Sequence, residues 1–202
     1  DLKNNRPQMV STGLGRTTCS YYLPGNQTIV YGSTHLGGEN CPAVPERRTD
    51  GKYVWPIYES FDIFTADLEG NIQAQLTNEP GYDAEATVSP KGDKMVFTSM
   101  RTGDLELYTM NIDGTDVKQI TTDLGYDGGA FFSPDGEKLI WRASRPKTDE
   151  EIKEYKFADD VCLLITRKAN CHGLLERDPK FKPQVSKSKK IYLNKKDKNK
   201  KK

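Results

Sequence analysis

The sequence has no long hydrophobic run and few residues of the kinds that carry out chemistry. No apolar stretch approaches the ~20 residues that a membrane-spanning helix needs, so we expect no membrane insertion. Only two His are present, and there is neither a Gly-x-Ser-x-Gly nucleophile elbow nor a carboxylate pair that stands apart from turn positions. We therefore predict no catalytic residues, no metal and no cofactor, and a protein that is not an enzyme.

Positive charge is also scarce, except at one end. Residues 178–202 hold eleven Lys against two Asp, a net charge of +9, which leaves −8 for residues 1–177. Only this end has the charge density that a polyanion ligand requires. Nucleic acid is therefore an unlikely partner except through residues 178–202. The first six residues lead into no apolar stretch, so a signal peptide is either absent or was removed before this numbering begins.

An internal repeat with a period of 44 residues is the strongest feature of the sequence. Residues 82–100, YDAEATVSPKGDKMVFTSM, align without a gap with residues 126–144, YDGGAFFSPDGEKLIWRAS. Residues 62–77 align in the same way with residues 106–121. A repeat of this length indicates that one small unit is stacked several times.

The repeat extends towards the N-terminus with one interruption. Residues 20–34 align with residues 86–100 at a spacing of 66, one period plus 22 residues. The extra residues predict an insertion loop at 36–59. Residues 9–12 align with a unit's last strand, so we assign 8–146 to the repeats, beginning with the end of a preceding unit.

Each unit is predicted to form four short strands joined by tight turns. One turn has the pattern Ser-Pro-x-Gly, which occurs as Ser89, Pro90 and Gly92 and again as Ser133, Pro134 and Gly136. Another turn, Asp113-Gly114, is flanked by β-forming residues, which is a strong hairpin signal. Four strands in one repeated period are typical of a β-propeller blade. The sequence therefore predicts an all-β fold, a β-propeller of four-stranded blades with about two and a half blades present.

The Ser-Pro-x-Gly-x-Lys turn, the buried strand that follows it and the Asn-x-Asp-Gly hairpin together resemble the WD-like repeat of TolB-type propellers. The resemblance implies a non-catalytic scaffold, periplasmic or secreted, that binds a protein or another ligand. The propellers of tricorn-like and prolyl-oligopeptidase-like peptidases share this repeat. The alternative is therefore the propeller portion of such a peptidase, without its catalytic domain.

The chain departs from this family after the third repeat begins. Residues 147–177 form a divergent segment. The aromatic strand and the Asp-Gly hairpin that the 44-residue period would place there are missing from its sequence. An incomplete propeller leaves an open edge, through which self-association is expected. Residues 178–202 are predicted to be a disordered, Lys-rich tail, because they offer too little apolar surface to offset the entropy of the chain.

The insertion loop offers one candidate binding site. Tyr53 and Trp55 are aromatic residues of the kind that anchors protein interfaces. The alternative is that both side chains pack the loop onto its own blade. The sequence leaves both interpretations open.

The four cysteines suggest one possible disulfide and no metal site. Cys19 and Cys41 belong to the same unit, and a disulfide between them would agree with an oxidising compartment. Two unpaired thiols are the alternative. Cys162, Cys171 and His172 lack the paired Cys-x-x-Cys spacing of structural zinc.

One set of charged residues recurs at the end of the second strand of each unit. His35, Arg101 and Arg145 occupy equivalent positions, and propeller symmetry would place them as a basic arc on one face. Asp83 and Asp127 also recur once per unit. We favour pairs in which each Arg binds a recurrent Asp and ties adjacent blades together. A ligand-binding arc is the alternative.

Overall fold

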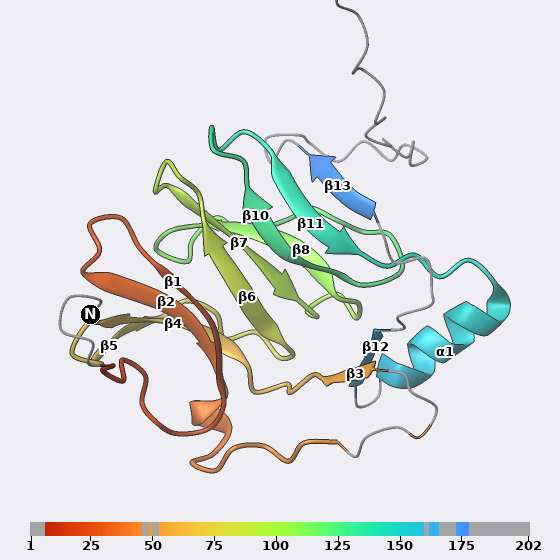
Figure 1. Cartoon of the computed structure of the whole chain (residues 1–202), viewed down its shortest axis with the longest axis horizontal. Coiled ribbons are helices and arrows are strands. Elements are labelled where there is room, and N and C mark those ends of the chain that lie inside the picture. Colours follow the sequence, from red (N-terminus) through yellow and green to blue (C-terminus); the bar gives the residue numbers. More distant parts are fainter. Residues whose placement is uncertain (1–6, 46–48, 50–52, 160–161, 166–172, 178–202) are drawn as a thin grey trace, which may run out of the picture.

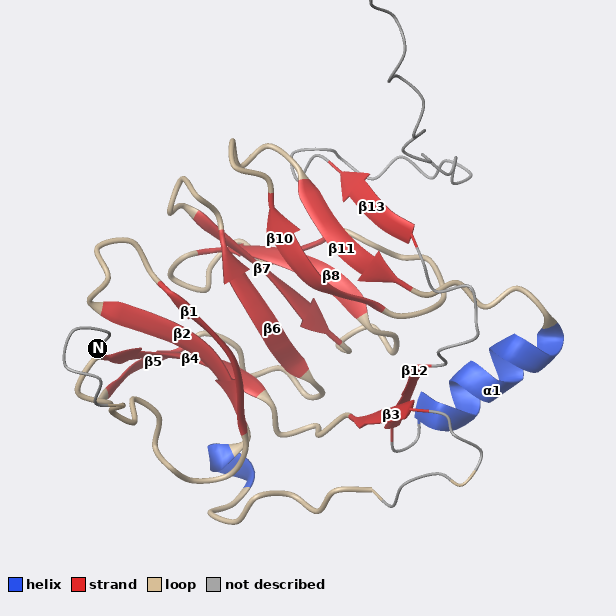
Figure 2. Ribbon diagram, in the orientation of Figure 1, coloured by secondary structure: helices blue, strands red, loops and turns tan. Residues whose placement is uncertain are grey.

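The described part of the chain forms three stacked antiparallel sheets with a small cap at one end (Figures 1 and 2). The computed structural model describes residues 7–45, 49, 53–159, 162–165 and 173–177. Blade 1 contains β1 (Thr17–Tyr22), β2 (Thr28–Ser33), β4 (Asp62–Asp67) and β5 (Ile72–Gln75). Blade 2 contains β6 (Asp83–Val88), β7 (Lys94–Ser99), β8 (Glu106–Asn111) and β9 (Lys118–Gln119). Blade 3 contains β10 (Asp127–Phe132), β11 (Leu139–Ala143) and β13 (Gly173–Arg177). The predicted all-β propeller fold is confirmed.

The recurrent turns form as predicted. The Gly92 amide donates to the Ser89 carbonyl and the Gly136 amide to the Ser133 carbonyl, both at 2.8 Å. Both glycines have a φ of +70°, which a side chain would disfavour. Asn26, at the equivalent position of the first unit, has a φ of +56°. Asn is the residue that best replaces Gly in this conformation, which explains why the first unit lacks the glycine.

The core consists of the interfaces between consecutive blades. One cluster joins Val30 and Ile63 of blade 1 to a buried face of blade 2, which presents Met95, Phe97, Tyr108 and Met110. A second cluster joins Val96 and Leu107 of blade 2 to blade 3, which presents Leu139 and Trp141. The central strands of blade 2 are thus buried on both faces, as expected for a sheet sandwiched between two others.

The first strand of every blade carries a β-bulge at the same repeat position. The pairing register shifts between Thr18 and Tyr21, between Ala84 and Thr87, and between Gly128 and Phe131. At the centre of each shift the backbone has a positive φ, at Cys19 (46°), Glu85 (61°) and Gly129 (60°). A recurrent bulge of this kind is a designed feature of a repeat, since it bends the strand and increases its twist.

Glu85 uses its bulge to reach the neighbouring blade. Its carboxylate accepts hydrogen bonds from the Gly129 amide (2.9 Å) and the Tyr126 hydroxyl (3.1 Å) of blade 3. Thr98 of its own blade also donates to it (2.8 Å). The carboxylate therefore links blades 2 and 3 directly.

Replacing Glu85 by Gly should lower the free energy of unfolding by about 1–2 kcal/mol, because three donors lose a charged acceptor. Glycine adopts a positive φ without strain, and its effect on the unfolded chain is shared with the control below. Cys19→Gly is the matched control at the equivalent bulge, and it should leave stability unchanged or raise it. Chemical denaturation followed by circular dichroism makes the comparison. Equal midpoints for the two variants would contradict the role given to Glu85.

Two expectations for the less regular parts of the chain were wrong, and the divergent segment contains elements that were not predicted. The insertion is not loop throughout: it contains the 3-10 turn η1 (His35–Gly37) at its start and β3 (Tyr53–Pro56), which pairs with β12 (Cys162–Ile165). The divergent segment contains α1 (Asp149–Asp159), and its strand β13 pairs with β11, so blade 3 has three strands rather than two. No strand forms at residues 9–12, where the preceding blade with which it would pair is not present among the described residues.

Candidate functional site

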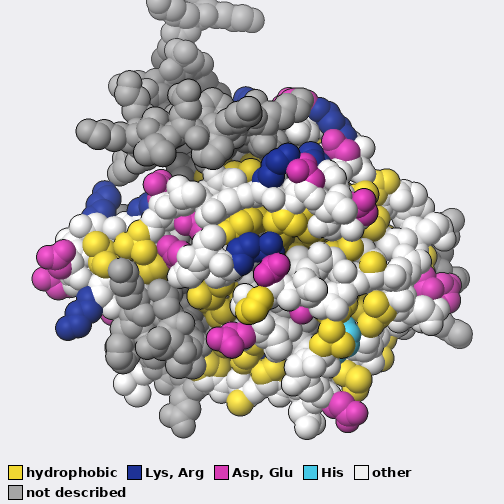
Figure 3. All heavy atoms as spheres, turned by 180° about the vertical axis from the view of Figure 1, so that it is seen from behind, with side chains coloured by type: hydrophobic (Ala, Val, Ile, Leu, Met, Phe, Trp, Pro, Cys, Tyr) yellow, Lys and Arg dark blue, Asp and Glu magenta, His cyan; other side chains and the backbone are white. Residues whose placement is uncertain are grey.

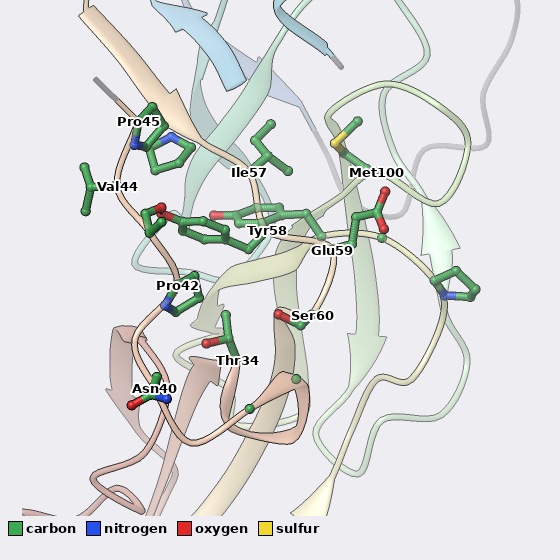
Figure 4. A pocket seen from close by; sticks show the side chains of 17 residues that line it. Thr34, Asn40, Pro42, Val44, Pro45, Ile57, Tyr58, Glu59, Ser60 and Met100 are labelled. Carbon is green, nitrogen blue, oxygen red and sulfur yellow. The ribbon is translucent and has the colours of Figure 1, made fainter. Parts of the chain in front are cut away.

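A hollow of about 950 Å³, here called the insertion pocket, lies where the insertion meets the blades. Two segments of the insertion, residues 40–45 and 56–60, form its walls. Thr34 at the end of β2 and Tyr82 and Met100 of the second repeat complete it. Figure 4 shows the side chains of both wall segments directed around one space. The pocket therefore exists only because the insertion folds back onto the repeat.

The lining of the insertion pocket is mostly apolar and contains four prolines. These are Pro42, Pro45, Pro56 and Pro80. Glu59 is the one charged side chain that lines the pocket among the described residues. Concave, largely apolar sites with a few polar groups are typical of ligand-binding pockets.

Tyr58 holds the two walls of the insertion pocket together. Its hydroxyl donates to the Ala43 carbonyl at 2.7 Å, and the Arg16 guanidinium lies 5.4 Å from the centre of its ring. Arg16 in turn donates to the Pro42 carbonyl at 3.5 Å. The ring is thus fixed by a hydrogen bond and a cation–π contact, which gives the pocket a defined shape before any ligand arrives.

The two recurrent arginines bind the recurrent aspartates, as favoured from the sequence. Arg101 Nη2 lies 2.8 Å from Asp83 Oδ2, and Arg145 Nη2 lies 2.8 and 2.7 Å from the two oxygens of Asp127. Both carboxylates are buried, and desolvation raises the pKa of Asp83 while Arg101 opposes that rise. Each pair joins the first and second strands of one blade, so the Arg–Asp bonds themselves do not tie adjacent blades. Arg101 nevertheless attracts Asp62 of blade 1, and Arg145 attracts Glu106 of blade 2. Consecutive blades are also joined next to the pairs, where the Asp83 amide donates to the Phe61 carbonyl (2.9 Å).

His35 takes the place of the arginine in blade 1. Its Nδ1 is hydrogen-bonded to Ser33 Oγ at 3.0 Å, and its ring lies 4.4 Å from that of Phe64. Arg101 makes the same two kinds of contact in blade 2, with Ser99 at 2.9 Å and with the ring of Tyr108 at 4.9 Å. Burial lowers the pKa of His35, so this member of the set is neutral. The three residues therefore occupy equivalent places, but each is bound within its own blade, and a ligand-binding arc remains only a prediction.

The structure does not bring the aromatic residues of the insertion and the two cysteines into one site. The backbone of Tyr53 and Trp55 lies in β3, and their role as binding anchors remains a prediction. Cys19 and Cys41 are both exposed, unpaired thiols, which is the alternative that the sequence left open beside a disulfide. Cys19 sits on the bulge of β1, close enough to Glu85 to interact with its charge.

The remaining predictions concern a metal site, a membrane span and the basic tail. Cys171, His172 and the tail at 178–202 lie outside the described residues. Among the residues that are described, no group of three or more potential ligands could hold a metal ion. None of the described helices is both long and apolar enough to cross a membrane. On the face seen in Figure 3, the visible basic side chains lie beside acidic ones rather than in one field.

Sequence reasoning missed most of the insertion pocket. Thr34, Tyr82 and Met100 were not singled out, although each lies next to a strand end that the repeat locates. The signal that would have found them is the site of the insertion itself, directly after the second strand of a unit. An insertion at that point must pass over the strand ends of its own blade and the next one.

Two four-stranded sheets and a three-stranded one, packed face to face with an equivalent bulge in each first strand, define part of a β-propeller with a pocket beside its blade ends. Residues 54–201 match the TolB beta propeller domain (PD40), and this match covers more than half of the chain. The chain therefore belongs to the TolB beta propeller domain family.

Two solved structures are similar to the chain. TolB from Acinetobacter baumannii is 20% identical, with a TM-score of 0.47 over 67% of this chain and 28% of its own. A TolB described as putative, from Agrobacterium tumefaciens, is 20% identical, with a TM-score of 0.43 over 65% of this chain and 55% of its own. The chain thus spans about a quarter and about half of these two proteins. No curated protein sequence matches it.

Proposed function

We propose that this chain is a non-catalytic scaffold of the TolB type that binds an extended segment of a partner protein in the insertion pocket. The observation that carries the proposal is the pocket itself, an apolar hollow with proline-rich walls that Tyr58 and Arg16 hold open. An extended segment fits between two extended walls better than a helix does. Membership of the TolB family supports a binding role and a location in the cell envelope or outside the cell.

The chemistry of the walls narrows the choice of segment. Apolar side chains would lie against Val44, Ile57 and Met100, where their burial is worth about 25 cal/mol per Å². Glu59 would favour a segment that carries a basic residue over one that carries an acidic residue. No feature of the described residues favours the peptidase alternative over this proposal.

Val44→Asp tests the binding role, because Val44 lines the pocket and is 69% exposed, so its replacement should not disturb folding. Peptides selected from a random display library on the unaltered protein should bind the variant about tenfold more weakly, as expected when one apolar contact of ~1.4 kcal/mol is lost. Fluorescence anisotropy of the labelled peptides measures the change.

Val117→Asp is the matched control, since Val117 is 39% exposed and does not line the pocket. It should bind the selected peptides as the unaltered protein does. Equal affinity of all three proteins would place the binding surface elsewhere, and failure to select any peptide would count against binding of extended segments.

A further inference from the structure

Two buried carboxyl groups meet one arginine where blade 2 joins blade 3. Glu106 begins β8 of blade 2 and is 3% exposed, and Asp127 begins β10 of blade 3 and is fully buried. Thr121, which is also buried, is close enough to lower the pKa of both carboxyl groups. The Asp127 amide donates to the Leu105 carbonyl at 2.8 Å, so the acids lie at the seam between the two blades.

The hydrogen-bond donors at this seam are too few for two carboxylates. Asp127 accepts from Trp141 Nε1 (2.8 Å) and from Arg145 at both oxygens. Glu106 Oε2 is buried and has no hydrogen-bond partner. Thr121 Oγ1 already accepts from the Leu107 amide (2.8 Å), and its single proton can serve only one carboxyl group. A buried acceptor that lacks a donor is costly, so the seam requires one more proton.

We infer that Glu106 carries this proton in the folded protein at neutral pH, and that losing it weakens the contact between blades 2 and 3. A protonated Glu106 is neutral, so its unpartnered, buried Oε2 carries no charge and costs much less free energy than a carboxylate oxygen would. An ionised Glu106 leaves two buried negative charges beside one guanidinium, and one of them lacks a donor. The junction is therefore a pH-sensitive element built into the propeller.

Burial and the neighbouring carboxylates favour the protonated form of Glu106. The pKa of Glu106 is raised to about 8, chiefly by burial and also by the charges of Asp127 and Asp104, while Thr121 and Arg145 oppose the rise. Burial also raises the pKa of Asp127 to about 6 against the effect of Arg145. Tyr108 is close enough to interact with the charge of Glu106, and Asp123 lies 3.8 Å from Arg145.

The sign of the pH effect follows from these shifts. Because Glu106 binds its proton more tightly when folded than its ordinary pKa of 4.5 allows, its contribution to stability is complete in acid and is lost as the pH rises towards 8. Burial lowers the pKa of His35, which gives the opposite trend. That histidine is common to all the variants below, so its effect cancels in the comparison.

The junction between blades 1 and 2 supplies an internal control. Asp62 and Thr77 there are the repeat equivalents of Glu106 and Thr121, and Thr77 donates to Asp62 at 3.1 Å. Asp62 also accepts from Gln75 Nε2 at 3.1 Å, whereas the equivalent Gln119 donates to Thr102. Both oxygens of Asp62 therefore have a donor, and this junction needs no extra proton.

Trp141 can report the state of the junction, because its indole donates to Asp127 and the chain's other tryptophan is Trp55. In a Trp55→Phe background, we expect the Trp141 emission to change as the pH passes about 8 and the denaturation midpoint to fall as the pH rises towards that value. Glu106→Gln mimics the protonated acid, so it should abolish the emission change near pH 8 and reduce the fall of the midpoint above about pH 6, where Asp127 is already ionised. Asp62→Asn should leave both as they are.

Emission and midpoints that titrate in Glu106→Gln as they do with Glu106 in place would overturn the inference. If Glu106→Gln does not fold, the number of protons released when the full unaltered chain unfolds tests the inference instead. Unfolding at pH ~7 in weakly buffered solution should release about one proton, since the folded state holds a proton that the unfolded state does not. No release, or uptake, would equally overturn the inference.

Discussion

Replacing Arg145 by Gln should lower the free energy of unfolding by about 3 kcal/mol at neutral pH. Arg145 binds both oxygens of Asp127, whose side chain is fully buried. Removing one partner of a buried ion pair leaves an uncompensated charge in the interior, which is the costly case. The loss should be smaller in mild acid, where Asp127 can take up a proton instead. Chemical denaturation at neutral and mildly acidic pH measures both effects.

Arg142→Gln is the matched control for this prediction. Arg142 lies in β11, three residues before Arg145, is exposed, and should change the stability by less than about 0.5 kcal/mol. Arg101→Gln is expected to fall between the two, because Arg101 binds Asp83 through one oxygen rather than two. If Arg145→Gln were as stable as Arg142→Gln, the arginine would not be structural, and the ligand-binding arc would become the better interpretation.

Replacing Phe97 by Ala should be at least as damaging, with a loss of about 3–5 kcal/mol. Phe97 is fully buried in the interface between blades 1 and 2, beside Tyr108 and below the guanidinium of Arg101. Truncation removes apolar contacts and leaves a cavity that two rigid sheets cannot close. Thermal and chemical denaturation should both report the loss.

Phe131→Ala provides the comparison for the core prediction. Phe131 is 53% exposed on β10, so its truncation should cost less than about 1 kcal/mol. A similar, small loss for Phe97→Ala and Phe131→Ala would mean that the interface between blades 1 and 2 contributes little to the stability of the fold.

Much of the propeller could be predicted from the 44-residue period. The period locates the strands to within a residue or two, because strand and turn propensities are local and recur with the repeat. It also placed Arg101 and Arg145 in equivalent roles beside Asp83 and Asp127, and the structure bears out the pairing. It did not say whether each pair closes one blade or joins two, since both arrangements have the same sequence spacing.

The insertion pocket and the proton at the blade junction could not be predicted in this way. The pocket depends on how residues 40–45 and 56–60 pack against the second repeat. Glu106 and Asp62 look alike in the sequence, as do Thr121 and Thr77. Only the structure shows that Gln75 reaches Asp62 while Gln119 turns to Thr102. The presence or absence of this one glutamine donor decides whether the junction acid has all its hydrogen bonds or must bind a proton.

The sequence by itself determined the repeated four-stranded unit, its turns, the position of the insertion and the TolB-type fold, because each depends on residues that are close in the chain. The tertiary structure decided the pairing of β3 with β12, the packing of α1 near them, the separation of Cys19 from Cys41 and the shape of the pocket. These features join segments that no period relates, and their geometry depends on how the blades stack. Strand and turn propensities depend on neighbours in the sequence. Contacts between distant segments depend instead on the apolar surfaces and hydrogen-bonding groups that the stacked blades leave uncovered.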